Sequence, residues 1–240
     1  MLRYSILLGI ATMLAIHPAA AQVAAAQLKG AVLDELGRPL AGARVVYAQK
    51  PRILPGKFGK GRSAPVERTL SSKVITDAFG RYEIPQLPSG DYYLCMTAPG
   101  YLTNCEWAQW RLATVAQGQV LDHGPVQLPK AAPVTIVIND PLSLLKEVKP
   151  PNSPLVVGVR DGFGRLHPAR ETAVVGNSHM FQVDVPYGTA MNVWLHSWRF
   201  FLTDSRGVAL DQRGAQVPFQ VALNGAAPTF IFNIGGPVKP

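Results

Sequence analysis

The sequence is poor in the residues that build most catalytic and metal-binding sites. Its 240 residues include five histidines and two cysteines. No histidine is followed three residues later by glutamate, and no His-Glu-x-x-His segment occurs, so the common zinc-binding patterns are missing. The nearest approach to a Gly-x-Ser-x-Gly nucleophile motif, at residues 176–180, lacks the second glycine. The sequence therefore predicts no enzyme, no catalytic residue, no metal and no cofactor.

Long apolar runs are also scarce, and the one that exists lies at the amino terminus. Arg3 precedes an apolar run over residues 6–16, and small residues follow at 19–21. This order is typical of a secretory signal peptide over residues 1–21, which is cleaved after its last alanine or at a second small-residue site at 24–26. No later stretch approaches the roughly 18 apolar residues of a spanning helix. We expect a secreted, periplasmic or cell-envelope protein without a membrane span; the alternative is a retained membrane anchor.

Cysteine is limited to Cys95 and Cys105. An even pair in an exported protein usually forms a disulfide. Closing so short a loop contributes roughly 3 kcal/mol to stability in the chain-entropy model. A metal or redox pair is the alternative, but it favours Cys-x-x-Cys spacing or nearby histidines, and neither is present.

Acidic residues are outnumbered, with 15 Asp and Glu against 23 Lys and Arg. Removal of the leader lowers the formal net charge from +8 to +7, because Arg3 is its only charged residue. Such a surplus favours anionic neighbours. Much of it lies in residues 50–73, a loop rich in proline and glycine, where Lys57, Lys60 and Arg62 are candidate anion contacts. The alternative is a solvated insertion, and because the loop lacks a Gly-Lys-Ser/Thr ending, nucleic acid is not a favoured partner.

Helical periodicity is missing throughout, and short β-favouring runs replace it. We expect residues 28–34 and 43–47 to pair across a turn, and residues 74–76 and 81–84 to form a hairpin around the Asp-x-x-Gly turn at 77–80. A further strand over 91–98 alternates apolar and polar side chains. The sequence therefore predicts an all-β fold.

Residues 27–128 carry a specific string of turn and core motifs. They are Gly30-x-Val32-x-Asp34, Gly37-x-Pro39-Leu40-x-Gly42-Ala43-x-Val45, Thr76-Asp77-x-x-Gly80-x-Tyr82, Leu87-Pro88-x-Gly90-x-Tyr92-x-Leu94 and Ala98-x-Gly100-Tyr101. The string resembles the carboxypeptidase regulatory-like domain, which implies a seven-stranded transthyretin-like (prealbumin-like) sandwich of the kind grouped with carbohydrate-binding-like folds. The chain departs from the family at the basic loop and the cysteine pair. The family is named for a domain that accompanies a zinc carboxypeptidase, so the resemblance transfers no chemistry. It implies instead a spacer, a stabiliser or a binding module, as such modules are common in bacterial envelope proteins.

The second half begins after a predicted linker at 129–133. Turn signals recur through residues 134–235, including an Asp-Gly-Phe-Gly hairpin signal at 161–164, and helical periodicity is again missing. This pattern is typical of a second antiparallel β-sandwich of immunoglobulin-like type, followed by a tail at 236–240.

One stretch of this half, residues 191–203, suggests a binding surface. If it is a single strand, Met191, Val193 and Leu195 face the core, and an aromatic row with one imidazole lies on the other face. The candidate ligand-binding residues of that row are Trp194, His196, Trp198 and Phe200. Sugar rings present flat C–H faces that stack on indoles, so the row is a candidate glycan platform. The alternative is a strand buried on both faces, with His196 as a core residue.

Trp107 and Trp110 form a second aromatic candidate site beside the expected disulfide. They either pack against the bridge or form an exposed stacking pair. The leading hypothesis is therefore an exported, non-catalytic envelope protein that binds carbohydrate. The alternative is a structural or protein-interaction module, and the remote one is a hydrolase accessory domain. Exposed coplanar rings would favour the glycan hypothesis, and buried rings would favour interaction.

Overall fold

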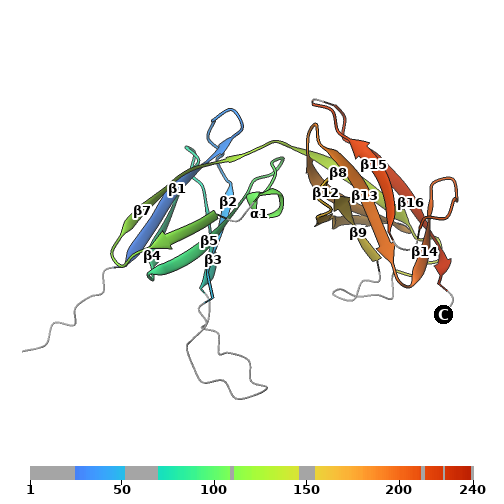
Figure 1. Cartoon of the computed structure of the whole chain (residues 1–240), viewed down its shortest axis with the longest axis horizontal. Helices are drawn as coiled ribbons and strands as arrows, with labels where there is room; N and C mark the ends of the chain where they lie inside the picture. The colour runs from blue at the N-terminus through green and yellow to red at the C-terminus, as the bar shows by residue number, and fades with distance from the viewer. Residues whose placement is uncertain are drawn as a thin grey trace, which may run out of the picture.

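The computed structural model describes residues 25–51, 70–108, 111–145, 155–211, 214–223 and 225–238. These residues form two β-sandwich domains that lie side by side (Figure 1). The all-β prediction is confirmed. The leader at 1–21, the loop residues Lys57, Lys60 and Arg62, and Trp110 lie outside the described residues. Within the described ranges, no helix has the length and apolar character needed to cross a membrane.

The first domain contains seven strands and one short helix. In chain order they are β1 (Ala26–Asp34), β2 (Arg44–Gln49), β3 (Ser71–Ile75), β4 (Arg81–Leu87), β5 (Gly90–Thr97), α1 (Asn104–Trp107), β6 (Arg111–Val115) and β7 (Val120–Leu128). One sheet has the strand order β4-β1-β7 and the other β3-β2-β5-β6. All pairs are antiparallel except β1 with β7.

Alternating side chains build the core of this domain. In β5, Tyr92, Leu94 and Met96 are completely buried, as the alternation predicts. Leu28 and Val32 of β1 face them from the other sheet and are equally inaccessible. Burying one such aliphatic or aromatic side chain stabilises the fold by roughly 1.5–3 kcal/mol relative to leaving it exposed.

Both hairpins predicted for this domain are wrong. β1 and β2, like β3 and β4, are consecutive in sequence but lie in different sheets. The turn at Asp77 has the expected chemistry, since its carboxylate accepts the amides of Phe79 and Arg81 at 2.9 and 2.8 Å. However, Gly80 of that turn accepts the Val32 amide at 2.8 Å and thereby directs the chain towards β1. The turn is a corner between the sheets.

The second domain packs a four-stranded sheet on a five-stranded sheet. Its strands are β8 (Ala131–Asn139), β9 (Leu155–Arg160), β10 (Leu166–Pro168), β11 (Arg170–Val175), β12 (Ser178–Pro186), β13 (Ala190–Ser197), β14 (Phe200–Asp204), β15 (Ala215–Gln220) and β16 (Thr229–Pro237). The sheet orders are β10-β9-β13-β15 and β11-β12-β8-β16-β14. β8 and β16 are parallel, so in both domains the first strand pairs with the last. Here β9 and β10 do form the predicted hairpin.

The two domains are joined by a very short connection. β7 ends at Leu128 and β8 begins at Ala131, so most of the predicted linker at 129–133 belongs to a strand. Pro129 and Lys130 remain between the strands, and both are tied to the first domain. The Pro129 carbonyl accepts the Leu102 amide at 2.8 Å, and Lys130 forms a β-bridge with Tyr101. At the other end, β16 extends to Pro237 and takes in part of the predicted tail.

Candidate functional site

The helix α1 is fixed to the first domain by a covalent bond and a cap. Cys105 is joined to Cys95 of β5 by the predicted disulfide, with the Cα atoms 5.4 Å apart. Thr103 is the N-cap, and its hydroxyl accepts the Cys105 amide at 3.3 Å. The helix has only four residues, so these external links hold it in place.

Asn104 joins the same helix to the edge of β5. β6 pairs with β5 only as far as Leu94, so beyond Leu94 this edge of β5 has no strand neighbour among the described residues. The Asn104 side chain takes that place. Its Oδ1 accepts the Met96 amide at 2.6 Å, and its Nδ2 donates to the Leu94 carbonyl at 3.3 Å. We call Cys95, Thr103, Asn104 and Cys105 the α1 clamp.

The α1 clamp directs Trp107 into the second domain. The indole stacks on the imidazole of His167 in β10, with ring centroids 3.6 Å apart and an angle of 6° between the planes. Trp107 also packs against the apolar core of the second domain. The sequence predicted packing on the disulfide or an exposed pair with Trp110; the structure instead places Trp107 between the domains.

The His167 imidazole also interacts with the carboxylate of Asp161, which is the first residue of the β9–β10 turn. The imidazole Nε2 lies 3.4 Å from the Asp161 Oδ2, and the His167 side chain is buried. Burial of the carboxyl acts to raise the pKa of Asp161, but hydrogen bonds from the Arg165 amide, the His167 ring and the Phe163 amide outweigh burial and hold the pKa below its ordinary value. Asp161 therefore keeps its negative charge beside the histidine.

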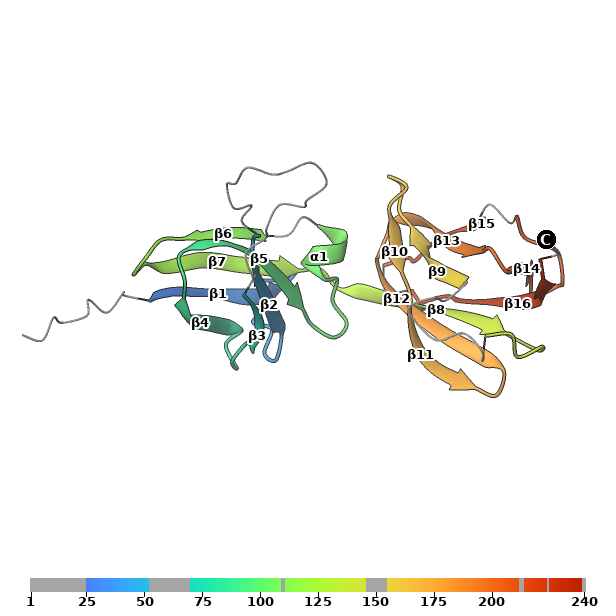
Figure 2. The same cartoon turned by 90° about the horizontal axis from the view of Figure 1, so that it is seen from below.

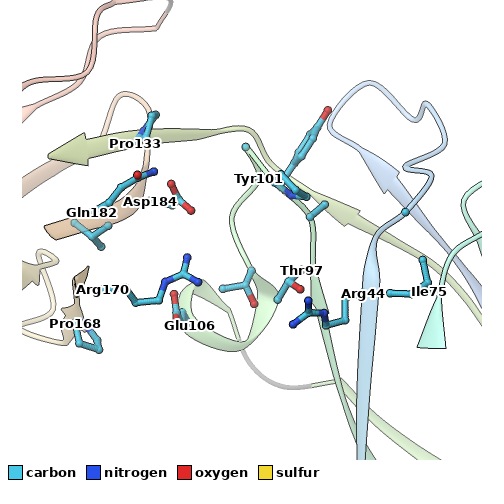
Figure 3. Close-up of a pocket in the computed structure, with 16 residues that line it drawn as sticks. Arg44, Ile75, Thr97, Tyr101, Glu106, Pro133, Pro168, Arg170, Gln182 and Asp184 are labelled. Atoms are coloured by element: carbon cyan, nitrogen blue, oxygen red, sulfur yellow. The ribbon is translucent and has the colours of Figure 1, made fainter. Parts of the chain in front are cut away.

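A cleft of about 660 Å³ opens beside this contact (Figure 3). Both domains contribute to its walls, as the positions of the labelled side chains show. The first domain supplies Arg44, Thr97, Tyr101 and Glu106, and the second supplies Pro168, Arg170, Gln182 and Asp184. Glu106 belongs to α1, so the α1 clamp also positions one wall of the cleft.

The cleft carries both signs of charge, and the described side chains that line it form no ion pairs with one another. Arg44 and Arg170 come from opposite domains, and Glu106 and Asp184 do likewise. Among the described residues, none of these four side chains makes a salt bridge. All four charges are thus available to a partner. The sequence analysis missed them, because the arginines are distant in sequence and only the domain arrangement brings them together.

The aromatic row exists, but it is shorter than predicted, and its members differ in exposure. Trp194 and His196 lie on the outer face of β13, with ring centroids 5.6 Å apart and planes inclined by 23°. Trp198 follows at 6.3 Å from His196, tilted by 42°. Trp194 is only 9% exposed, whereas Trp198 is 57% exposed. We use "aromatic row" for Trp194, His196 and Trp198.

Phe200 does not belong to the row. The predicted single strand over 191–203 is two strands, β13 and β14, which lie in different sheets. The Ser197 hydroxyl accepts the amides of Arg199 and Phe200 at 3.3 and 3.0 Å and so stabilises the turn between them. In its own sheet Phe200 faces the core and is 6% exposed. The core positions predicted for Met191 and Leu195 are confirmed, as each is 1% exposed.

The sequence analysis also missed Arg160, which packs on the row. Its guanidinium carbon lies 4.4 Å from the centroid of the Trp194 ring. Trp194 is further covered by Gly214, where a β-carbon would collide with the indole. A basic residue two positions beyond a strand glycine gives no distinctive sequence signal. The described residues contain no group of three or more His, Cys, Asp or Glu side chains that could hold a metal ion.

Comparison with known proteins identifies one of the two domains. The model of the family described as the carboxypeptidase regulatory-like domain matches residues 27–128. This match confirms the resemblance that the sequence motifs indicate. Among curated proteins, no sequence matches significantly.

Solved structures resemble the chain only distantly. A streptococcal ancillary pilin is 14% identical, with a TM-score of 0.39, over 89% of this chain and 63% of the pilin, so the chain spans less than two thirds of it. A minor pilin of Streptococcus agalactiae is 13% identical, with a TM-score of 0.35, over 89% of this chain and 98% of that one. A putative carbohydrate binding protein from Pseudomonas aeruginosa is 17% identical, with a TM-score of 0.25, over 47% and 92%. Likenesses this weak carry no argument about function.

We expect replacement of Cys95 and Cys105 by serine to destabilise the first domain. The double variant loses the loop constraint, which corresponds to roughly 3 kcal/mol in the chain-entropy model. Denaturant unfolding, followed by circular dichroism, should show an earlier first-domain transition. The second-domain transition serves as the internal control, and an unchanged first-domain midpoint would contradict the prediction.

We also expect Trp107→Ala to loosen the arrangement of the two domains, because it removes the stack on His167. Small-angle X-ray scattering should show a broader distribution of interatomic distances than for the wild type. Trp198→Ala is the matched control, since that indole is exposed and is not among the residues that line the interdomain cleft. Identical scattering from the wild type and Trp107→Ala would show that the stack does not hold the domains.

Proposed function

Residues 27–128 form a carboxypeptidase regulatory-like domain, and from this premise we propose that the protein is an exported, non-catalytic interaction module of the cell envelope. Its partner is a protein that binds in the cleft between the two sandwiches. The proposed export depends on the signal peptide predicted for residues 1–21. The non-catalytic character is supported by the Asp residues of the chain, such as Asp77 and Asp161, whose carboxylates bond the amides of their own turns.

The proposal is based on the cleft between the two domains, whose walls carry both arginines and carboxylates. A polypeptide surface presents both cations and anions, so it can complement the arginines and the carboxylates of the cleft together. A polyanion such as nucleic acid would meet Glu106 and Asp184 with repulsion. The Trp107–His167 stack and the two-residue connection set the walls before a partner arrives, which reduces the ordering cost of binding.

Free strand edges beside the cleft offer backbone contacts as well. Among the described strands, β3 pairs only with β2, and β11 pairs only with β12. Ile75 at the end of β3 and Arg170 at the start of β11 both line the cleft. All six residues of β11 are exposed, so its outer edge is open to an added strand. An extended segment of the partner can therefore enter the cleft and continue along β11.

Reversal of the two cleft arginines should abolish partner binding. The immobilised mature protein is incubated with solubilised envelope proteins, and the retained protein is identified and quantified. We expect the double variant Arg44→Glu and Arg170→Glu to retain at least about tenfold less of it, since two charge-assisted contacts become repulsive. The control, Arg206→Glu, alters an arginine whose side chain is 82% exposed in a turn outside the cleft. Equal retention by the cleft variant and the control would refute the cleft as the binding site.

A second candidate function, glycan binding, is favoured by the exposure of Trp198. An indole that is 57% exposed beside His196 presents a flat face to a sugar ring. Trp194 cannot serve in this way, because it is covered, and its buried state favours the interaction module over a broad glycan platform. The two functions can coexist, since the cleft and the aromatic row use different residues.

For this second candidate, Trp198→Ala should remove retention on envelope polysaccharide without changing the melting temperature. The physical reason is that the indole contributes stacking area but little core packing. Retention is measured by affinity electrophoresis in gels that contain the polysaccharide, and circular dichroism reports the fold. Trp194→Ala is informative as a contrast, because loss of a buried indole should lower the melting temperature as well. Unchanged retention by Trp198→Ala would exclude the row as a glycan site.

A further inference from the structure

Arg160 is a cation that has no ionic partner among the described residues. Its guanidinium lies over the Trp194 ring at 4.4 Å, and its Nε is buried and makes no hydrogen bond within the described part of the chain. No carboxylate described in the structure forms a salt bridge with it. The positive charge of Arg160 is therefore not neutralised by any described carboxylate and can attract an external anion to the accessible part of the guanidinium.

Strand register places Arg160 in line with the aromatic row. β9 and β13 are antiparallel neighbours, with Gly158 opposite Trp194 and Val156 opposite His196. Because side chains alternate along a strand, Arg160 lies on the same outer face as Gly158 and therefore beside the row. The order along this face is Arg160, Trp194, His196 and Trp198, each within 6.3 Å of the next by the ring and guanidinium distances.

The two ends of this line offer different chemistry. Arg160 presents a planar cation that is pre-oriented by the indole beneath it, which suits two-point binding of a carboxylate. Trp198 presents an exposed apolar face that suits a sugar ring. We propose that this outer face of β9 and β13 binds an acidic polysaccharide, whose carboxylate bonds Arg160 while another ring of the same chain stacks on Trp198.

The proposal refines the second candidate function and rests on it, since it names the class of glycan. An acidic polypeptide would satisfy Arg160 equally well but gains little from an isolated flat indole at the far end of the row. A neutral polysaccharide would stack on Trp198 but leave Arg160 unsatisfied. The positive net charge of the mature protein, +7 once Arg3 is removed with the leader, also favours the acidic polymer, because it raises the local concentration of anions.

Three polymers distinguish these ligands in affinity electrophoresis of the full-length mature protein. Polygalacturonate is the acidic polysaccharide, and fully methyl-esterified polygalacturonate is the same sugar chain without charge. Poly-glutamate supplies carboxylates without sugar rings. We expect polygalacturonate to retard the protein at least about tenfold more strongly than either other polymer, and this preference to weaken as salt is raised.

Variants assign the binding to the line of residues. Arg160→Gln removes the charge and should weaken polygalacturonate binding about tenfold or more, as expected for a charge-assisted hydrogen bond. Arg160→Lys keeps the charge but loses the planar fork, so it should bind with intermediate strength. Arg206→Gln removes an equal charge elsewhere and should bind as the wild type does. Trp198→Ala shortens an exposed side chain and should keep the fold, so its loss of polygalacturonate binding still tests the proposal if Arg160→Gln unfolds.

The outcomes separate the inference from the function on which it rests. Equal binding of the esterified and the acidic polymer, with loss in Trp198→Ala, would overturn the acidic class but retain a glycan site. Equal binding of poly-glutamate and polygalacturonate would show a simple anion site and overturn the proposal. If neither polysaccharide binds, both the acidic-polysaccharide proposal and the glycan-binding function on which it rests would be overturned. Stronger binding of polygalacturonate that is lost in Arg160→Gln and Trp198→Ala, but kept in Arg206→Gln, would establish it.

Discussion

The disulfide between Cys95 and Cys105 and the amide of Asn104 together replace a missing piece of strand. β6 covers the edge of β5 only from Gly90 to Leu94, and the α1 clamp covers the backbone groups that follow. This constraint fixes a helix that is too short to be stable alone, and the helix in turn fixes the direction of Trp107. The stack on His167, the arrangement of the domains and the wall of the cleft all depend on it. The view from below shows α1 at the side of the first domain that faces the second (Figure 2).

Local patterns predicted the strands well and their pairing poorly, and two turns show why. The Asp77 and Asp161 turns have the same bonds, because each carboxylate accepts the amides two and four residues later. The first is a corner between sheets, and the second closes a paired hairpin. An Asx turn satisfies its own backbone in either setting. What decides the outcome at the first turn is the bond from the Val32 amide to the Gly80 carbonyl, which joins residues far apart in sequence and leaves no local signal.

The candidate sites show the same division between local and long-range information. Alternation placed Met191 and Leu195 in the core correctly, but it could not detect that Ser197 ends the strand and sends Phe200 to the other sheet. The disulfide was predicted from the single pair of cysteines together with the expected export of the protein. By contrast, the stack of Trp107 on His167 and the presence of Arg44 and Arg170 in one cleft both result from the way the two domains pack together. Sequence periodicity indicates which face of one strand is buried, but it contains no information about contacts between domains.

The β9–β10 hairpin links the two proposed surfaces physically. Arg160 ends β9 and faces the aromatic row, and Asp161, the next residue, holds His167 against Trp107. The same turn therefore positions the cation of one surface and the interdomain stack that shapes the other. The Asp161 carboxylate accepts hydrogen bonds from the amides of its turn and also interacts with the His167 imidazole. These interactions occupy the carboxylate, so Asp161 helps to position both surfaces but is not available to a ligand of either. Two binding surfaces on this protein would thus share one rigid turn, while their ligands would contact separate residues.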